Sequence, residues 1–147
     1  MKIGHAHIKV RDLERSTAFY ERFLGLSVRE RIEGHFVFMS GTDMHHEIAL
    51  QQVGMGARTP GRFEVGLFHV AFEAPDRPSL ARSFKQLIDH GIPVVAVDHR
   101  ISWAIYFNDP DGNGLEIYCD TRREPDGSEL WDGMDRPLVA EQLLAYL

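Results

Sequence analysis

The sequence has a single cysteine, Cys119, so no disulfide can form within the chain and nothing requires an oxidising compartment. It has no run of 18 or more apolar residues of the kind that spans a membrane, and no apolar leader-like stretch follows Met1. It also lacks an excess of basic residues, since the net charge is −6 and no basic stripe is present. We therefore expect a cytoplasmic enzyme that acts on small molecules, with neither nucleic acid nor membrane as a partner.

What the chain does contain is typical of a folded domain with a real core. Hydrophobic residues make up 44% of its 147 residues and charged residues 26%, a balance that argues against disorder. This length fits one domain. Eight histidines are a high number, so their positions are the next question.

The first part of the chain predicts a strand, a helix and three further strands. Apolar and polar residues alternate over residues 3–10, as in a strand with one buried face. Asp12 is a good helix N-cap, and Gly25 suits the position after the helix end, so we predict a helix over 13–24 with Phe19 and Phe23 on one face. Three strand-like runs follow, at 26–32, 36–39 and 47–52.

The same order of elements repeats in the second part. A strand at 66–73 leads to the N-cap Asp76 and to a helix that ends near Gly91. Strands are then predicted near 94–97, 103–108 and 115–119, with a tight turn over 109–114.

The repeat predicts an α+β fold made of two tandem βαβββ modules. The modules, 1–52 and 66–119, would be joined by a glycine-rich linker at 53–65 and would form one domain over 1–120. We expect a curved mixed sheet around a metal cavity, with the helices outside. Residues 121–147 form a C-terminal tail whose last part has helix-forming composition.

Two histidines occupy the same place in the two modules. His5 and His69 are each followed seven residues later by the aspartate that opens the helix, and Glu116 lies on the last strand of the second module. A lone histidine on a strand is most often a surface or satisfied core residue. Three matched placements, all on the strand face away from the helices, favour a metal site instead. Two imidazoles and one carboxylate suit a divalent first-row metal with open coordination positions.

Three stretches of the chain resemble the vicinal oxygen chelate superfamily, which includes glyoxalases, bleomycin and fosfomycin resistance proteins and type I extradiol dioxygenases. The stretches are Gly-His-Ala-His-Ile-Lys-Val-Arg-Asp-Leu-Glu-Arg-Ser-Thr-Ala-Phe-Tyr with Leu-Gly-Leu (4–26), Phe-His-Val-Ala-Phe (68–72) and Tyr-Phe-Asn-Asp-Pro-Asp-Gly-Asn-Gly-Leu-Glu-Ile-Tyr (106–118). The resemblance covers about residues 1–120. It implies that His5, His69 and Glu116 are the metal ligands.

Further residues resemble the extradiol dioxygenase branch. His46 falls where that branch carries a histidine just before an apolar strand, near the metal. His99 falls where it carries a histidine before the last hairpin, and Tyr106 where it carries a tyrosine ten residues before the ligand glutamate. His7 falls where the branch often has a polar residue near bound oxygen, whereas His99 is about two residues nearer the tyrosine than in the larger enzymes. Each also has an ordinary reading, as a solvated strand start, a loop residue or a hydrogen-bonded tyrosine, and strand alternation groups His46 with apolar residues.

This branch implies an Fe(II) enzyme, or alternatively a Mn(II) enzyme, that cleaves a small aromatic diol with O₂ and pairs as a homodimer. In such an enzyme His46 would move the diol proton, and Tyr106 and His99 would donate hydrogen bonds to developing oxyanions. Phe36, Phe38 and Trp103 could form aromatic walls, although core packing explains them equally well.

Two other readings remain within the same superfamily. Glyoxalase I-like isomerases and epimerases use a fourth ligand from the last strand of the first module, where this chain offers Glu47 or Ala49. An inward Glu47 would favour such an isomerase with Zn(II) or Ni(II), whereas an inward Ala49, which we favour, leaves three protein ligands. The other reading is a metal-free protein that sequesters a small molecule such as an antibiotic, which would have no need of His5, His69 and Glu116 together.

Overall fold

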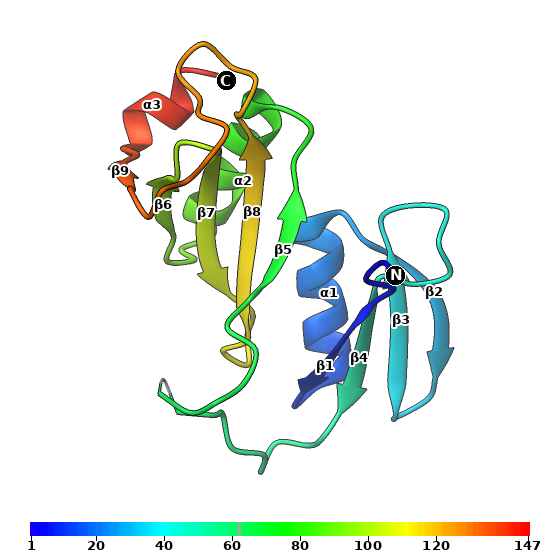
Figure 1. Cartoon of the computed structure of the whole chain (residues 1–147). Coiled ribbons are helices and arrows are strands. Elements are labelled where there is room, and N and C mark those ends of the chain that lie inside the picture. The colour runs from blue at the N-terminus through cyan, green and yellow to red at the C-terminus, as the bar shows by residue number, and fades with distance from the viewer. Residues whose placement is uncertain (62) are drawn as a thin grey trace. The chain divides into compact units, whose positions relative to one another are not determined.

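The computed structural model describes residues 1–61 and 63–147, which fall into two units (Figure 1). The first unit contains residues 1–68 together with 109–113, and the second contains 69–108 together with 114–147. Residue 62 of the predicted linker 53–65 lies outside the described residues. The predicted α+β class and the two βαβββ modules are confirmed, with the strands arranged as two mixed sheets. That residues 1–120 form a single domain stays a prediction.

The strands of the first unit form a four-stranded sheet in the order β1-β4-β3-β2. β1 runs parallel to β4, and the other neighbours are antiparallel, with a bulge in β2 between Val28 and Glu30. The strands start and end within about three residues of the predicted bounds. They are β1 (Ala6–Val10), β2 (Ser27–Ile32), β3 (Phe36–Ser40) and β4 (Ile48–Gln52).

Helix α1 (Leu13–Leu24) packs on one face of this sheet, against β4, β3 and β2 (Figure 1). The Asp12 side chain accepts a hydrogen bond from the backbone N–H of Arg15 at 2.8 Å, and Gly25 ends the helix with a φ of 65°, as the sequence predicted. Phe19 and Phe23 do contact each other, with ring centroids 4.9 Å apart, but they are only partly buried. The buried face of the helix instead carries Leu13, Ser16, Thr17 and Tyr20.

The second unit repeats this arrangement with one added strand. Its sheet has the order β5-β8-β7-β6-β9, and β5 runs parallel to β8 just as β1 does to β4. The added strand comes from the C-terminal tail and pairs with β6. The strands are β5 (Val70–Glu73), β6 (Val95–Asp98), β7 (Ser102–Asn108), β8 (Gly114–Asp120) and β9 (Arg136–Pro137).

Helix α2 (Arg77–Asp89) covers the face of this sheet that carries the apolar residues of β7 and β8. Asp76 caps it by accepting a hydrogen bond from the backbone N–H of Ser79 at 2.7 Å. Its buried residues are Leu80, Ala81, Phe84 and Leu87, whereas Ile88 is 40% exposed.

The tail adds a short helix, α3 (Ala140–Leu144), which contacts α2. Leu143 of this helix is fully buried. Arg77 fixes the tail further, because its guanidinium binds Asp126 at 2.7 Å and the Tyr146 hydroxyl at 2.9 Å. The same guanidinium lies 4.1 Å from the ring centre of Trp103, so this tryptophan belongs to the packing around α2 and is not an aromatic wall of the site.

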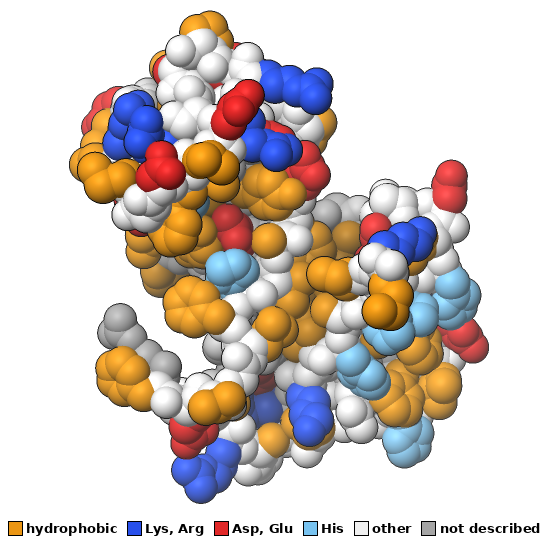
Figure 2. Space-filling model, in the orientation of Figure 1, with side chains coloured by type: hydrophobic (Ala, Val, Ile, Leu, Met, Phe, Trp, Pro, Cys, Tyr) orange, Lys and Arg blue, Asp and Glu red, His pale blue; other side chains and the backbone are white. Residues whose placement is uncertain are grey.

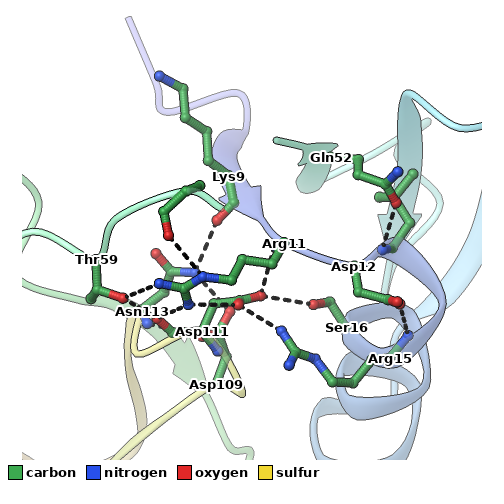
Figure 3. A network of polar contacts seen from close by, with 12 residues as sticks. Lys9, Arg11, Asp12, Arg15, Ser16, Gln52, Thr59, Asp109, Asp111 and Asn113 are labelled. Atoms are coloured by element: carbon green, nitrogen blue, oxygen red, sulfur yellow. Dashed lines mark hydrogen bonds and ion pairs between the residues drawn. The ribbon is translucent and has the colours of Figure 1, made fainter. Parts of the chain in front are cut away.

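The turn at 109–113, between β7 and β8, belongs to the first unit and is held there by a polar network (Figure 3). Asp111 is buried and accepts from Arg11 at 3.0 Å and from Arg15 at 2.6 Å. Asp109 accepts from the backbone N–H groups of Asp111 and Asn113, both at 2.8 Å, and from the Tyr20 hydroxyl at 3.2 Å. These contacts satisfy the buried carboxylates, so the predicted turn is also an anchoring point.

The charges in this network shift the pKa of its members. Burial raises the pKa of the Asp111 carboxyl, but the hydrogen bonds from Arg15 and Arg11 outweigh it and leave that pKa below its ordinary value. Burial and the neighbouring Asp109 raise the pKa of Tyr20. Asp111 is therefore ionised and Tyr20 neutral near pH 7. Among the described residues no helix is long and apolar enough to cross a membrane.

Candidate metal and oxygen-chemistry site

Each of the two predicted ligand histidines stands directly before a parallel strand. His5 precedes β1 and His69 precedes β5, so both strands begin later than the sequence suggested, but the two positions are equivalent. Two residues further on, His7 is registered with Ala49 in the first unit, and Ala71 is registered with Glu116 in the second. Ala49 therefore occupies the place in the first unit that Glu116 occupies in the second.

In the second unit, His69 and Glu116 lie together. The Nε2 atom of His69 is 2.8 Å from Oε2 of Glu116, and the Glu116 side chain is only 10% exposed. The strand register explains the placement of the next residue, because Tyr106 on β7 lies directly opposite Glu116 on β8. The Tyr106 hydroxyl donates to Oε1 of Glu116 at 3.0 Å. Each oxygen of this carboxylate thus has one predicted site residue as a partner.

The predicted His99 continues this chain of contacts. It follows β6, and its Nε2 atom is 2.7 Å from the Tyr106 hydroxyl while its Nδ1 atom is 2.6 Å from Oδ1 of Asp135. The Trp131 indole N–H donates to the same Asp135 oxygen at 2.7 Å. A phenol has one proton, so if Tyr106 donates to Glu116, its oxygen accepts from Nε2–H of His99. His99 thus links the Asp135 carboxylate to the Tyr106 hydroxyl.

The pKa shifts agree with this direction of donation. Burial, reinforced by the negative charge of Glu116 and the hydrogen bond to it, raises the pKa of the Tyr106 phenol. The hydrogen bonds from His99 and Trp131 lower the pKa of Asp135. Near pH 7, Tyr106 is therefore a neutral donor and Asp135 a carboxylate.

Asp135 and Trp131 are site residues that sequence reasoning missed. They reach His99 because β9 of the tail pairs with β6, with Val97 opposite Pro137 and Asp98 opposite Arg136. The contact joins residues 36 positions apart through a segment with no strong strand pattern. Nothing in the local sequence pointed to it.

The first unit brings together the remaining predicted histidines, on the sheet face away from α1. The ring of His5 lies 4.5 Å from that of His46, centre to centre, and His46 also contacts Phe38 at 5.0 Å. His7 contacts the edge of Phe36 at 5.7 Å. Figure 2 shows histidine side chains gathered beside hydrophobic ones on this unit. His46 lies just before β4, so the alternation that grouped it with Ile48 and Leu50 does not extend to it.

The surroundings of His46 keep it neutral. Burial lowers its pKa, and the neighbouring imidazoles of His5, His45 and His7 lower it further, against a smaller opposing effect of Glu30. A neutral imidazole has one free lone pair and one N–H, which suits it to accept and return a proton.

The donor set in the second unit fits a divalent cation. Two protein donors that bind one ion at about 2.1 Å, a right angle apart, lie about 3 Å from each other. The separation of 2.8 Å between His69 and Glu116 is close to that value. His5, the third predicted ligand, belongs to the first unit, and within residues 1–61 and 63–147 no group of three or more His, Cys, Asp or Glu is assembled as a metal cluster. The triad as a whole therefore stays a prediction.

Glu47, the alternative fourth ligand, is engaged elsewhere. Its Oε2 atom accepts from the Ser40 hydroxyl at 3.1 Å and from the Gly41 backbone N–H at 3.0 Å, which fixes the loop after β3. Ala49 is 1% exposed and lies between His7 and Phe38 in the sheet register. The first unit thus presents no free carboxylate at the position equivalent to Glu116.

Comparison with known proteins gives consistent results. A family described as the Glyoxalase/Bleomycin resistance protein/Dioxygenase superfamily matches residues 2–117. Catechol-2,3-dioxygenase of Bacillus subtilis (strain 168) is 36% identical over 121 residues, which are 82% of this chain and 42% of that protein. Biphenyl-2,3-diol 1,2-dioxygenase 3 of Rhodococcus globerulus is 33% identical over 131 residues, 86% of this chain and 67% of that protein. The chain thus spans less than half the length of the first of these relatives.

Solved structures share the fold at lower identity. A glyoxylase/bleomycin resistance protein/dioxygenase domain from Frankia sp. EAN1pec has a TM-score of 0.67 at 22% identity, covering 82% of this chain and 98% of that one. Lactoylglutathione lyase from Agrobacterium tumefaciens has a TM-score of 0.63 at 23% identity, covering 80% and 92%. These likenesses concern the fold alone.

Proposed function

This chain belongs to the Glyoxalase/Bleomycin resistance protein/Dioxygenase superfamily, and from that premise we propose that it is an extradiol ring-cleaving dioxygenase. The substrate would be a small aromatic diol, the chemical class named in the catechol and biphenyl-diol dioxygenases to which the chain is similar. Both atoms of O₂ enter the product as the ring C–C bond beside the diol breaks. The reaction is redox-balanced and needs no further reductant.

We propose that His5, His69 and Glu116 hold Fe(II), with Mn(II) as the alternative. Such a metal acts as a Lewis acid that lowers the pKa of the diol and holds both reactants in one place. The support from the second unit is the 2.8 Å approach of His69 to Glu116. The support for His5 is its equivalence to His69 at the head of a parallel strand. Ala49, in the place equivalent to Glu116, carries no donor atom in its side chain and would add no fourth ligand.

The chain's own residues would then handle protons and charge. His46 is neutral near pH 7, so it can take a proton from a diol hydroxyl and return it later. Tyr106 stays protonated and can donate to an oxygen on which negative charge develops. His99 lies 2.7 Å from the same phenol and can replace the proton that Tyr106 gives. Asp135 holds the ring of His99 in this orientation.

The observation that carries this proposal is the continuous run of contacts from His69 through Glu116, Tyr106 and His99 to Asp135. A cup that merely binds an apolar ligand gains nothing from a buried carboxylate with a histidine on one oxygen and a tyrosine on the other. A dioxygenase would use them to hold a metal and to donate hydrogen bonds to developing oxyanions.

The test is to load the purified chain with Fe(II) without oxygen, then to admit air with a panel of catechols. We expect one iron per chain, O₂ uptake, and a ring-fission product that absorbs in the visible range. The iron-free protein, treated in the same way, is the control. An iron-loaded chain that consumes no O₂ with any catechol would overturn the proposal.

The same samples discriminate the other members of the superfamily. Isomerisation of a glutathione hemithioacetal by the Zn(II) or Ni(II) form, without O₂ uptake, would indicate a glyoxalase-like isomerase. The contacts of Glu47 with Ser40 and Gly41 count against that outcome, because they occupy the candidate fourth ligand. A chain that retains no divalent metal would instead be a binding protein.

A homodimer is a further part of the proposal and follows from the family resemblance. Light scattering coupled to gel filtration measures the mass directly. A mass near twice the 16.8 kDa of one chain would support it, and a mass near 16.8 kDa would refute it.

A further inference from the structure

In two adjacent histidines of the first unit, the Nδ1 atom of one ring points at the Nδ1 atom of the other. His45 and His46 lie in the loop between β3 and β4, and their Nδ1 atoms are 2.8 Å apart. The other nitrogen of His45, Nε2, lies 3.0 Å from a carboxylate oxygen of Glu30 on β2. The arrangement therefore has two imidazole nitrogens directed at one point and a carboxylate behind one of the rings.

We infer that His45 and His46 form a second cation site, for a divalent ion such as Zn(II) or Cu(II), with Glu30 as the outer carboxylate. Imidazole is the ligand these ions favour among neutral side chains. Metal-ligating histidines almost always donate their other ring N–H to a carboxylate or carbonyl, which fixes the tautomer that leaves the ligating lone pair free. Glu30 is placed to accept that hydrogen bond from His45.

The distances need little adjustment. Two imidazole nitrogens bound to one tetrahedral ion at about 2.0–2.1 Å lie roughly 3.3 Å apart. The Nδ1 atoms at 2.8 Å would therefore separate by about half an ångström, which rotation of two partly exposed rings allows. Without the ion, if His45 donates Nε2–H to Glu30, its Nδ1 atom accepts from Nδ1–H of His46. With the ion, that proton moves to Nε2 of His46, so neutral rings bind with no net loss of protons.

Neighbouring rings hold both imidazoles in place before an ion arrives. His46 lies between His5, at 4.5 Å, and Phe38, at 5.0 Å, and Phe38 also contacts His45 at 6.0 Å. Such support lowers the entropy lost when the rings are fixed by binding. In the described part of the chain no third His, Cys, Asp or Glu completes a metal cluster, so water would fill the other coordination positions. The His45 side chain is 60% exposed, which gives an ion direct access.

This inference does not require the proposed dioxygenase site. An ion on Nδ1, with the proton on Nε2, leaves His46 no lone pair to accept a proton, so zinc bound here should inhibit the proposed dioxygenase. The experiment separates the two sites. In the full chain, the double substitution His69→Ala and Glu116→Gln removes the proposed iron ligands of the second unit. Zinc is then titrated by calorimetry while the histidine ring signals are followed by NMR. We expect one Zn(II) per chain, with the ring signals of His45 and His46 shifted and those of His35 unchanged.

Adding His45→Ala to this background should abolish the zinc binding, whereas the matched His35→Ala should preserve it. Because His45 is exposed in a loop, the fold should survive the change, which circular dichroism checks. Glu30→Gln should weaken zinc binding about tenfold to a hundredfold, as loss of an outer partner does. Zinc stoichiometry and ring signals that are unaffected by His45→Ala would overturn the inference. If only the proposed function fails, Fe(II) loading gives no O₂ uptake while this zinc site remains.

Discussion

The two units share the βαβββ topology but carry apolar residues in one and polar residues in the other at equivalent positions. In the second unit the residue pair at the centre of the sheet is Tyr106 opposite Glu116, and in the first unit the equivalent pair is Phe38 opposite Ala49. The second unit therefore places a buried, hydrogen-bonded carboxylate beside its strand-heading histidine. The first places aromatic and imidazole rings there instead.

The two copies of the βαβββ scaffold therefore differ in which side chains need hydrogen-bonding partners. A buried carboxylate is stable only with hydrogen-bonding partners, and Glu116 has His69 and Tyr106. Tyr106 in turn contacts His99, which contacts Asp135. The first unit carries no such carboxylate at that point, so its histidines are exposed or half-buried and rest on Phe36 and Phe38. Under the proposed function, the second unit would supply the charged ligand and its hydrogen-bond donors, and the first unit a proton-transfer group beside aromatic rings.

The largest effect should come from removing the feature that distinguishes the second unit. Glu116→Gln keeps the shape of the side chain but loses the negative charge, so the chain should no longer retain stoichiometric iron and should lose dioxygenase turnover. Metal analysis after gel filtration measures the first effect and O₂ uptake the second. Glu73→Gln on neighbouring β5 is the matched control and should retain both. Full iron content in Glu116→Gln would remove this residue from the ligand set.

The next effect tests the role of the first unit. His46→Phe should leave iron content unchanged but lower turnover by about 10² to 10⁴, the range for loss of a general acid–base group. The aromatic replacement preserves the contacts with His5 and Phe38. His35→Phe, in the turn between β2 and β3, is the control. If His46→Phe turns over at the normal rate, proton transfer does not belong to this unit.

Tyr106→Phe converts the second unit's central tyrosine into the first unit's phenylalanine. We expect turnover to fall about 10² to 10³-fold, as with the loss of a single donor to a developing oxyanion, with KM changed little. Steady-state kinetics on the best catechol measure both values. Tyr118→Phe, on the same sheet, should be close to wild type, and an equal loss in that variant would point to a general structural effect.

A smaller effect is expected at Asp135, which acts through His99. Asp135→Asn removes the negative charge but leaves a side-chain oxygen that can accept a hydrogen bond from the His99 ring. We expect kcat to fall about tenfold, the low end of the range for loss of such a partner. KM should change little, because Asp135 acts only through the ring of His99. Asp132→Asn in the same tail is the control. An unchanged kcat would mean that the tail does not position His99, and an equal change in KM would point to a general structural effect.

The smallest effect concerns stability and the anchoring of the 109–113 turn. Asp111→Asn should lower the free energy of unfolding at pH 7 by about 1–2 kcal/mol, since one of its two arginine partners is substantially exposed. Because folding lowers the pKa of Asp111 below 3.8, its contribution is present above that pH and is lost as pH falls through the folded value. Urea titrations between pH 7 and 3 should therefore show a decrease in the free energy of unfolding of the wild type that is absent in Asp111→Asn. Parallel curves for the two proteins would contradict this.

Local sequence determined much of the protein. Period-two alternation, the caps Asp12 and Asp76 and the glycine at position 25 act within a few residues, so the helices and most strands could be read directly. The turn at 109–114 could be predicted for the same reason, because its signal also lies within a few residues. The ten-residue spacing in a tight hairpin also places Tyr106 opposite Glu116, and the structure has that register.

Tertiary structure alone decided which polar groups complete the site. Asp135 and Trp131 reach His99 only because β9 pairs with β6. The sequence offered both Glu47 and Ala49 as the counterpart of Glu116, and the parallel registers of β1 with β4 and β5 with β8 decide for Ala49. The sequence by itself fixed the duplicated βαβββ scaffold and the histidines that head it, because those signals are periodic and short-range. The partners came from pairing between distant segments, which depends on packing and burial that no local pattern encodes.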